Sequence, residues 1–432
     1  MYNHYNLVVG ENTLVPIANG RRVRYVNLDN AATTPAFKNV VEDLLDFLPY
    51  YSSIHRGMGY KSQVSTKFYE DGRKAVAKFI GADLNNSSII FVKNATEGIN
   101  KLSNMLYNKY KDTVILSTEM EHHSNDLPWR KFQVEYVKVD RYGKLCLEHL
   151  EESLKKHGGK VSLVAVTGAS NVTGYKNQIH TIAKIAHSYG AKILVDGAQL
   201  VPHAPVDIKH FDSSEHIDYL VFSAHKMYAP FGIGVLIGPR DELEDLPPDY
   251  SGGGTVDAVT HDYVRWLKTP EKDEAGSPNV LGVVALTSAI KTLNKLNMKN
   301  IEEYENKLLK YTLSRIERVP QVNLYCKNCN ENVSIITFNV EGMYHEVVSK
   351  ILSNEFGIGV RSGCFCAHPY VQRLLNISPE EVIRISREHG NRPGMVRASL
   401  GAYNNFDEID YFIYALNNIV KKKSFYLEKY NK

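Results

Sequence analysis

Several residues that could do chemistry stand directly after apolar runs. The clearest is Lys226, which follows the run 219–222 and comes after Ser223 and His225. Lysine is among the residues least tolerated in a protein interior unless something pairs with it. Lys226 therefore either reaches solvent at the end of a buried strand or takes part in a reaction.

Four other apolar runs end in polar residues in the same way, and they are 88–92, 113–117, 162–168 and 192–196. Thr96 and Gly98 follow the run 88–92 where a helix begins, and such a position can hold phosphate with backbone N–H groups, a hydroxyl and the positive helix end. A simple N-cap by Thr96 is the plainer alternative. Asn171 follows the run 162–168 in a polar turn. Asp196 ends the run 192–196, and a buried aspartate needs a cationic or hydrogen-bonding partner.

Metal sites are weakly indicated. His122 and His123 follow the run 113–117, but no third ligand stands at the spacing of known zinc motifs. Cys326 and Cys329 form a single C-x-x-C pair without a second pair, which favours ordinary loop cysteines over a zinc or redox site. The sequence therefore predicts no metal.

The five strand ends together offer a phosphate cradle, an imidazole, an Asn, an Asp and a Lys. Open α/β sheets bind ligands beyond the carboxyl ends of their strands. Pyridoxal phosphate (PLP) needs a lysine for its aldehyde and an acid beside its pyridine nitrogen. We therefore expect PLP, with Lys226 bound to the aldehyde and with Ser223 and His225 near the phosphate.

The elements that position these residues follow an α/β pattern. Apolar runs alternate with helical patterns such as 96–110 and 179–190, and most runs are continuous, as in strands covered on both faces. This alternation predicts a mainly parallel sheet. After about residue 286 the pattern changes to one long helical stretch, 285–319, a strand at 333–340 and further helices. We therefore expect three parts: an N-terminal segment 1–25 that packs on the small domain, a large PLP-binding domain 26–286, and a small C-terminal α+β domain 287–432.

Bulk properties exclude several classes. The chain of 432 residues is 43% apolar and 23% charged, which is ordinary for a globular protein. A net charge of +3 gives no case for nucleic acid or membrane binding, and no apolar run approaches membrane-spanning length. The N-terminus lacks a secretion signal, and five cysteines, an odd number, favour a reducing cytoplasm. The segment 421–432 is expected to be a solvated tail or a frayed helix end.

Motifs spread over nearly the whole chain resemble a known family. They include "NATEGIN", "EHHSNDLPW", "DGAQLVPHAPVDI", "FSAHKMYAPFGIGVL" and "RSGCFCAHP", in family order. The sequence resembles class V aminotransferase-type enzymes of PLP fold type I, and within them the SUF-type (group II) cysteine desulfurases. The resemblance implies a large domain with a mainly parallel sheet, a smaller C-terminal domain that carries the cysteine loop, and a homodimer.

The resemblance also implies residue roles. Lys226 would bind the cofactor covalently, Asp196 would face its pyridine nitrogen, and Gln199 its phenolic oxygen. His123 would stack on the ring and move protons, as a catalytic residue beside Lys226 and Cys366. Further implied contacts are the phosphate ligands Thr96, Glu97, Gly98, Ser223 and His225, the partner subunit's Thr255, and the substrate-carboxylate ligands Asn171 and Arg397. Arg56 would line the partner subunit's site or be structural.

The loop 361–369 decides the reaction. On the family register Cys366 is the nucleophile that takes sulfur from L-cysteine as a persulfide and leaves L-alanine. Arg361 and His368 would favour its thiolate. Cys364 departs from the pattern, and the C-x-C pair that it forms with Cys366 resembles the loop of molybdenum-cofactor sulfurases. Cys364 could resolve the persulfide, pass sulfur on or form a disulfide. Because the two cysteines are two residues apart, we expect them on opposite faces of the loop.

Other reactions on this fold are alternatives. They are a C–S or selenocysteine lyase acting on a related amino acid, an epimerase, a biosynthetic aminotransferase, or a non-catalytic partner protein. A thiol in the loop favours the desulfurase, because simple transamination needs none, and Lys226 argues against a non-catalytic role. A sulfur-acceptor protein is a further expected partner.

Overall fold

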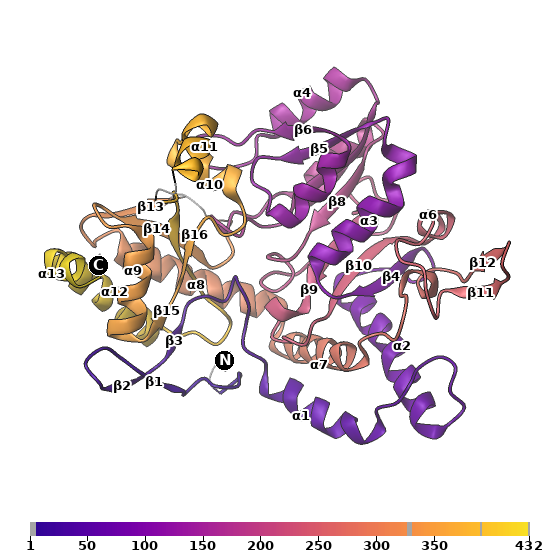
Figure 1. Cartoon of the computed structure of the whole chain (residues 1–432), viewed down its shortest axis with the longest axis horizontal. Coiled ribbons are helices and arrows are strands. Elements are labelled where there is room, and N and C mark those ends of the chain that lie inside the picture. The colour runs from indigo at the N-terminus through magenta and orange to yellow at the C-terminus, as the bar shows by residue number, and fades with distance from the viewer. Residues whose placement is uncertain (1–5, 326–330, 389–390, 431–432) are drawn as a thin grey trace.

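A seven-stranded sheet forms the centre of the larger part of the molecule. The computed structural model describes residues 6–325, 331–388 and 391–430 (Figure 1). Across the sheet the strands are β4 (Ser87–Val92), β10 (Gly234–Pro239), β9 (Tyr219–Ser223), β8 (Lys192–Asp196), β7 (Val161–Thr167), β5 (Val114–Thr118) and β6 (Gln133–Val137). Only β10 runs antiparallel to its neighbours. The predicted α/β fold with a mainly parallel sheet is confirmed, and β6 is a strand that the pattern did not reveal.

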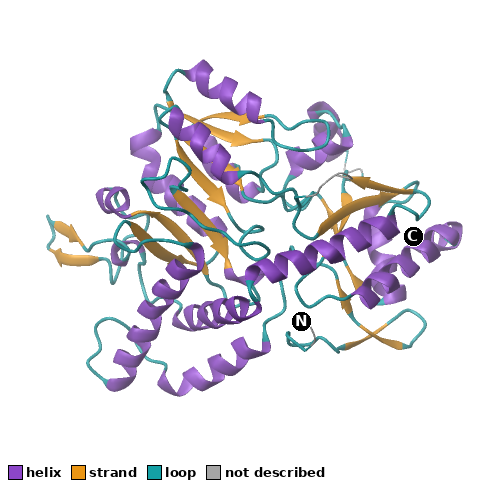
Figure 2. Cartoon of the chain, turned by 180° about the vertical axis from the view of Figure 1, so that it is seen from behind, coloured by secondary structure: helices purple, strands orange, loops and turns teal. Residues whose placement is uncertain are grey.

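Helices cover both faces of this sheet (Figure 2). They are α1 (Lys38–Phe47), α2 (Tyr60–Ile80), α3 (Ala95–Tyr110), α4 (Leu147–His157), α5 (Ile179–Ser188), α6 (Arg240–Asp245) and α7 (Val280–Leu296). Successive residues of one strand enter different cores: Ile193 and Val195 pack with α5, whereas Leu194 packs with α3. Burial on both faces explains why the strands read as continuous apolar runs.

A smaller antiparallel sheet with its own core follows. Its strands, in order, are β13 (Val322–Tyr325), β14 (Ile335–Val340), β17 (Met395–Ser399) and β16 (Arg361–Gly363). The helices around it are α8 (Met298–Ile316), α9 (His345–Phe356), α12 (Phe406–Lys421) and α13 (Lys423–Tyr430). The single long helix expected at 285–319 is wrong, because Asn297 adopts φ +67° and separates α7 from α8. The expected solvated tail is also wrong: α13 buries Tyr426 in this core.

The N-terminal segment lies against the smaller sheet. Its strands are β1 (Leu14–Pro16), β2 (Arg22–Arg24) and β3 (Val26–Asn27), and β3 pairs with β15 (Ile358–Gly359). Arg24 forms an ion pair of 3.0 Å with Glu408 on α12. These contacts place residues 24–27 beside the C-terminal part of the chain.

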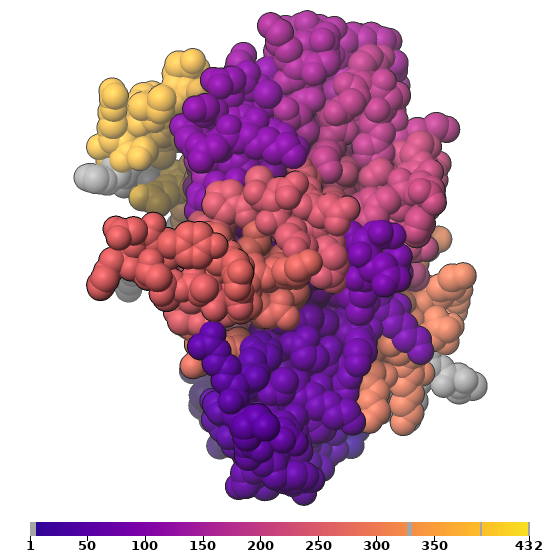
Figure 3. All heavy atoms as spheres, turned by 90° about the vertical axis from the view of Figure 1, so that its right-hand side faces the viewer, coloured from indigo at the N-terminus to yellow at the C-terminus, as the bar shows by residue number. Residues whose placement is uncertain are grey.

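The remaining elements are short. They are the hairpin β11 (Val256–Val259) and β12 (Val264–Trp266), α10 (His368–Leu375), α11 (Pro379–Arg387) and the 3-10 turns η1 (Leu48–Tyr50), η2 (His123–Asn125), η3 (Leu127–Lys131), η4 (Ala224–Lys226) and η5 (Glu271–Asp273). The hairpin projects from the body of the molecule (Figures 1 and 3). Among the described residues, no helix is both long and apolar enough to cross a membrane.

Candidate active site

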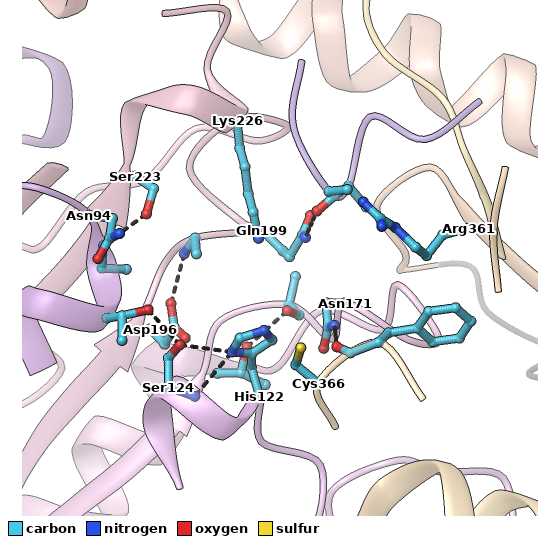
Figure 4. A pocket seen from close by; sticks show the side chains of 18 of the residues that line it. Asn94, His122, Ser124, Asn171, Asp196, Gln199, Ser223, Lys226, Arg361 and Cys366 are labelled. Carbon is cyan, nitrogen blue, oxygen red and sulfur yellow. Dashed lines mark hydrogen bonds between the residues drawn. The ribbon is translucent and has the colours of Figure 1, made fainter. Parts of the chain in front are cut away.

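A cavity of about 520 Å³ lies where the carboxyl ends of the large sheet meet the loop after β16 (Figure 4). Nine residues singled out from the sequence line it: Thr96, Asn171, Asp196, Gln199, Ser223, His225, Lys226, Cys366 and Arg397. Arg361 and His368 also line it, as do Asn94, His122, Ser124 and Phe365, to which sequence reasoning gave no role. Glu97, Gly98, His123, Thr255 and Arg56 do not line it.

Lys226 reaches into this cavity from the turn that follows β9. Figure 4 shows its side chain extending toward Gln199, with His122 and Cys366 on the opposite side. Burial lowers the pKa of Lys226 to about 8, because desolvation and the charge of Arg397 outweigh the attraction of the Asp196 carboxylate. A lysine with such a pKa has a far larger neutral fraction at physiological pH than an exposed one, and the neutral amine is the form that attacks a carbonyl.

Asp196 and Gln199 are buried at the end of β8. Asp196 accepts a hydrogen bond of 3.0 Å from the Ala198 N–H, and burial raises the pKa of Asp196. Gln199 donates from Nε2 to the Ala31 carbonyl at 2.7 Å, which leaves its buried Oε1 without a hydrogen-bond partner. Buried polar atoms are almost always paired, so this oxygen marks a position for a bound donor.

Polar groups at the start of α3 form another part of the cavity wall, apart from Asp196 and Gln199. The Ser223 hydroxyl accepts from the Ala95 N–H at 2.8 Å, and Thr96 Oγ1 lies 2.7 Å from Ser124 Oγ. These groups and the positive end of the sixteen-residue helix α3 suit an anion such as phosphate. Burial lowers the pKa of the neighbouring His225 to about 4, so its ring is neutral at physiological pH.

The expected contributions of Glu97 and Gly98 are corrected. The Glu97 N–H donates to Asn94 Oδ1 and the Gly98 N–H to the Asn94 carbonyl, so Asn94 uses both groups. Asn94, not Thr96, is the N-cap of α3. A Cβ on Gly98 would lie 3.3 Å from Val221, which shows that this glycine lets the helix pack closely on the sheet.

Of the adjacent pair His122 and His123, it is His122 that lines the cavity, whereas the predicted His123 does not. His122 Nδ1 accepts from the Ser124 N–H at 3.0 Å, and burial lowers the pKa of His122 to about 3, so the ring is neutral. His123 begins η2 and faces away: its Nε2 accepts from the His368 N–H, and its N–H donates to the Cys366 carbonyl at 2.7 Å. His123 therefore supports the cysteine loop, and His122 is the member of the pair that faces the cavity.

Arg397 forms a cationic wall. It lies on β17 and is 3% exposed, and it donates to the Asn171 carbonyl at 2.8 Å and to Asp29 at 3.3 Å. Arg361 lies 3.2 Å from the same Asp29 carboxylate. Two guanidinium groups thus share one carboxylate, and the buried Arg397 Nε has no hydrogen-bond partner. The surplus of positive charge and the free donor fit a substrate carboxylate.

The loop after β16 brings Cys366 to the cavity. Phe365 and Cys366 both have positive φ, +51° and +53°, and this tight turn leaves Cys366 exposed while Cys364 is half-buried. Cys364 donates to the Pro393 carbonyl at 3.0 Å, and burial raises the pKa of its thiol. The cysteines do diverge, although by a turn and not by the extended backbone expected. Cys326 and Cys329 lie outside the described residues.

Arg56 and the loop that holds Thr255 lie together elsewhere. Arg56, Gly253 and Gly254 line a second hollow of about 510 Å³. Thr255 is buried and donates to the Gly252 carbonyl at 2.7 Å. Their contribution to a partner subunit stays a prediction.

The residues of the main cavity fit PLP. The fit rests on the Lys226 amine of lowered pKa, the buried Asp196, the orphaned Gln199 oxygen and the anion cradle at α3. Each of these features meets a chemical requirement of that cofactor.

Comparison with known proteins gives a consistent result. The Aminotransferase class-V family matches residues 26–412. A cysteine desulfurase of Escherichia coli is 35% identical over 413 residues, which cover 93% of this chain and 94% of the relative. Solved structures that resemble the chain include the apo cysteine desulfurase of Thermococcus onnurineus, with TM-score 0.83, 33% identity and coverage of 92% and 95%. Another is the cysteine desulfurase CsdA of Escherichia coli in an S-sulfonic acid form, with TM-score 0.79, 28% identity and the same coverage.

Proposed function

The chain belongs to the class-V aminotransferase family, and we propose that it acts there as a PLP-dependent cysteine desulfurase of the SUF type, converting L-cysteine to L-alanine. One observation carries the proposal: the Cys366 thiol, the Lys226 amine and the Arg397 guanidinium line the same cavity. A reaction that only transferred an amino group would need no thiol there.

Five groups would hold the cofactor. Lys226 would bind it covalently, Asp196 would pair with its pyridine nitrogen, and the Gln199 oxygen would accept from its hydroxyl group. His122 would cover the ring, and the start of α3 with Ser124, Ser223 and His225 would hold the phosphate. When bound, PLP withdraws electrons from the substrate's carbon atoms.

The other residues orient and attack the amino acid. Arg397 and Asn171 would fix the substrate carboxylate. Asn171 is itself held in position because its Nδ2 donates to the Phe365 carbonyl at 2.7 Å. The Cys366 thiolate would form a sulfur–sulfur bond with the substrate while the carbon–sulfur bond breaks. The electron pair of that bond stays with the substrate carbon, which takes a proton and becomes the methyl group of alanine. The Lys226 amine, which lines the same cavity, would move this proton.

Products and thiol variants test the proposal. With L-cysteine and a reductant, the enzyme should give alanine and sulfide in equal amounts, and brief exposure without reductant should add one sulfur to the peptide that carries Cys366. Cys366→Ser should lose at least 99% of turnover yet keep PLP. Cys364→Ser is the matched control and should keep a substantial fraction, because its thiol points to Pro393.

Other outcomes would identify an alternative. Pyruvate with ammonia as products, or turnover unchanged in both serine variants, would reject a protein-bound persulfide and favour a direct C–S lyase. A persulfide mapped to Cys364 would exchange the two roles.

A homodimer is part of the proposal. The segment 45–68 and the β11–β12 hairpin lie on the face of the molecule that Figure 3 shows, and both segments carry exposed large apolar side chains. They are Leu45, Leu48, Tyr50, Tyr51, Met58, Tyr60, Phe68, Tyr250, Val259, Tyr263, Val264 and Trp266. The hollow beside Arg56 and the loop of Thr255 connects the two segments. If a second copy covered this face, Arg56 and Thr255 of each copy would lie at the main cavity of the other copy.

The proposal also assigns domains and a compartment. The two sheets and cores support a division into a large and a small unit, with residues 1–25 on the small one. The expected boundary between residues 286 and 287 falls inside α7, whose Ala289, Ile290 and Leu293 pack in the core of the large unit. An exposed catalytic thiol needs a reducing compartment, which supports a cytoplasmic location. That exposure also lets a sulfur-acceptor protein reach the persulfide.

A further inference from the structure

A second cluster of ligand-type side chains lies away from the cavity. His187 lies in the last turn of α5, His216 belongs to the loop 209–217, and Asp218 immediately precedes β9. One Nε2 or Nδ1 atom of each histidine and one carboxylate oxygen all lie within 4.8 Å of one another, and no other such group occurs in the described part of the chain. The sequence predicted no metal, because its spacing does not show that these residues meet.

The hydrogen bonds fix which nitrogen of each ring faces the cluster. His187 Nδ1 lies 2.8 Å from the Ser214 carbonyl, and His216 Nδ1 lies 2.6 Å from the Ser213 carbonyl. A carbonyl can only accept, so both Nδ1 atoms carry hydrogen. This pattern is typical of histidines that bind metal through Nε2, because the other ring nitrogen donates to a backbone carbonyl or carboxylate.

Both Nε2 atoms face the Asp218 carboxylate. They lie 2.9 Å from Oδ2 for His187 and 3.3 Å from Oδ1 for His216, and the rings stack with centroids 4.2 Å apart. If both rings are neutral, two lone pairs face a carboxylate. If only His187 is protonated, it forms an ion pair with Asp218, but the lone pair of His216 still faces that carboxylate. If both are protonated, two cations lie in contact. A single cation between the three side chains removes each of these conflicts. Nitrogen–oxygen separations near 3 Å are also those of neighbouring ligands bound at about 2.0–2.2 Å to one metal ion.

We propose that His187, His216 and Asp218 bind a divalent cation of the zinc class, with water in the remaining position. Imidazole nitrogen with one carboxylate oxygen is a common zinc ligand set. The Ile193 N–H donates to Asp218 Oδ2 at 2.9 Å and orients the carboxylate. Lys192 does not neutralise it fully, since its amine lies 2.7 Å from Glu242 and 3.5 Å from Asp218.

The site would be structural. It lies at the amino end of β9, whereas Lys226 follows the carboxyl end of that strand. A bound ion would tie the loop 209–217 and the end of α5 to the strand that positions Lys226. Metal binding would therefore raise thermal stability without taking part in the reaction.

Zinc binding to the holoenzyme tests this site. Protein treated with a chelator and then titrated with Zn²⁺ should bind one ion that zinc X-ray absorption shows with nitrogen and oxygen ligands, including two imidazoles, and its melting temperature should rise. His187→Gln and His216→Gln should each weaken this binding at least tenfold, as loss of even a supporting partner costs 10–100-fold. His210→Gln is the matched control, because His210 is an exposed histidine of the same loop.

Thiols need a separate control. The titration is repeated in a Cys364→Ser, Cys366→Ser background, so that zinc on the catalytic loop is not counted. Absence of zinc binding, sulfur-only coordination, or affinity unchanged in both His187→Gln and His216→Gln would overturn the proposal. The spectrum of the unsubstituted holoenzyme decides the case if a histidine variant does not fold.

Discussion

Arg397→Ala should weaken substrate binding through loss of the carboxylate contact. In the structure the guanidinium is 3% exposed, its Nε has no partner, and Asp29 is shared with Arg361. Removing one partner of a desolvated charged pair costs about 2–5 kcal/mol. At about 1.4 kcal/mol per factor of ten, the dissociation constant of L-cysteine should rise about 30- to 4,000-fold.

The assay measures binding without turnover. In a Cys366→Ser background sulfur is not removed, so the absorbance change of bound PLP can be titrated with L-cysteine and with cysteamine, which lacks the carboxylate. Arg397→Ala should raise the dissociation constant of L-cysteine by about 30- to 4,000-fold and that of cysteamine by less than about threefold. This difference isolates the contact between the guanidinium and the substrate carboxylate.

Arg361→Ala supplies the matched control. Its side chain is 51% exposed and faces the same Asp29, so solvent should limit its contribution to less than about 1 kcal/mol, or about fivefold in the dissociation constant. Equal losses for L-cysteine and cysteamine in Arg397→Ala, or a larger effect of Arg361→Ala, would refute the assignment of Arg397 as the carboxylate ligand.

Three further predictions concern the cofactor and the assembly. Lys226→Ala should lose the borohydride-reducible PLP adduct; peptide mapping that finds the adduct on another lysine would contradict this. Because the pKa of Lys226 is lowered to about 8 and only the neutral amine attacks an aldehyde, covalent capture of PLP by apoenzyme should speed up with pH and level off above about pH 9; stopped-flow rates that still rise near pH 10.5 would show an ordinary lysine. Sedimentation should find a dimer, and Trp266→Asp should weaken it at least tenfold, whereas an active PLP-loaded monomer would reject a shared site.

The sequence was sufficient to bring most of the predicted site residues into one cavity, because the order of parallel strands along the chain determines which residues meet at the sheet edge. Residues that follow successive strands meet at one sheet edge, so Lys226, Asp196 and Ser223 could be placed in one site from their positions alone. Asn94 could have been found as well, since Asn directly before a helical pattern is a typical N-cap.

Side-chain direction was not accessible in the same way. His122 and His123 are identical in type and adjacent, and only the start of η2 turns the first into the cavity and the second under the cysteine loop. Asp29 could not be assigned from its position in the sequence, because its partners Arg361 and Arg397 are more than 330 residues away.

The sequence by itself determined the mainly parallel α/β sheet and the set of polar residues at its carboxyl edge, because both depend on periodicity and order along the chain. The tertiary structure decided which imidazole faces the cavity, how two arginines share Asp29, that Cys366 and not Cys364 opens to the site, and that His187 meets His216. These facts depend on turns such as the positive φ at Phe365 and Cys366 and on contacts between distant segments, and neither leaves a periodic signal in the sequence.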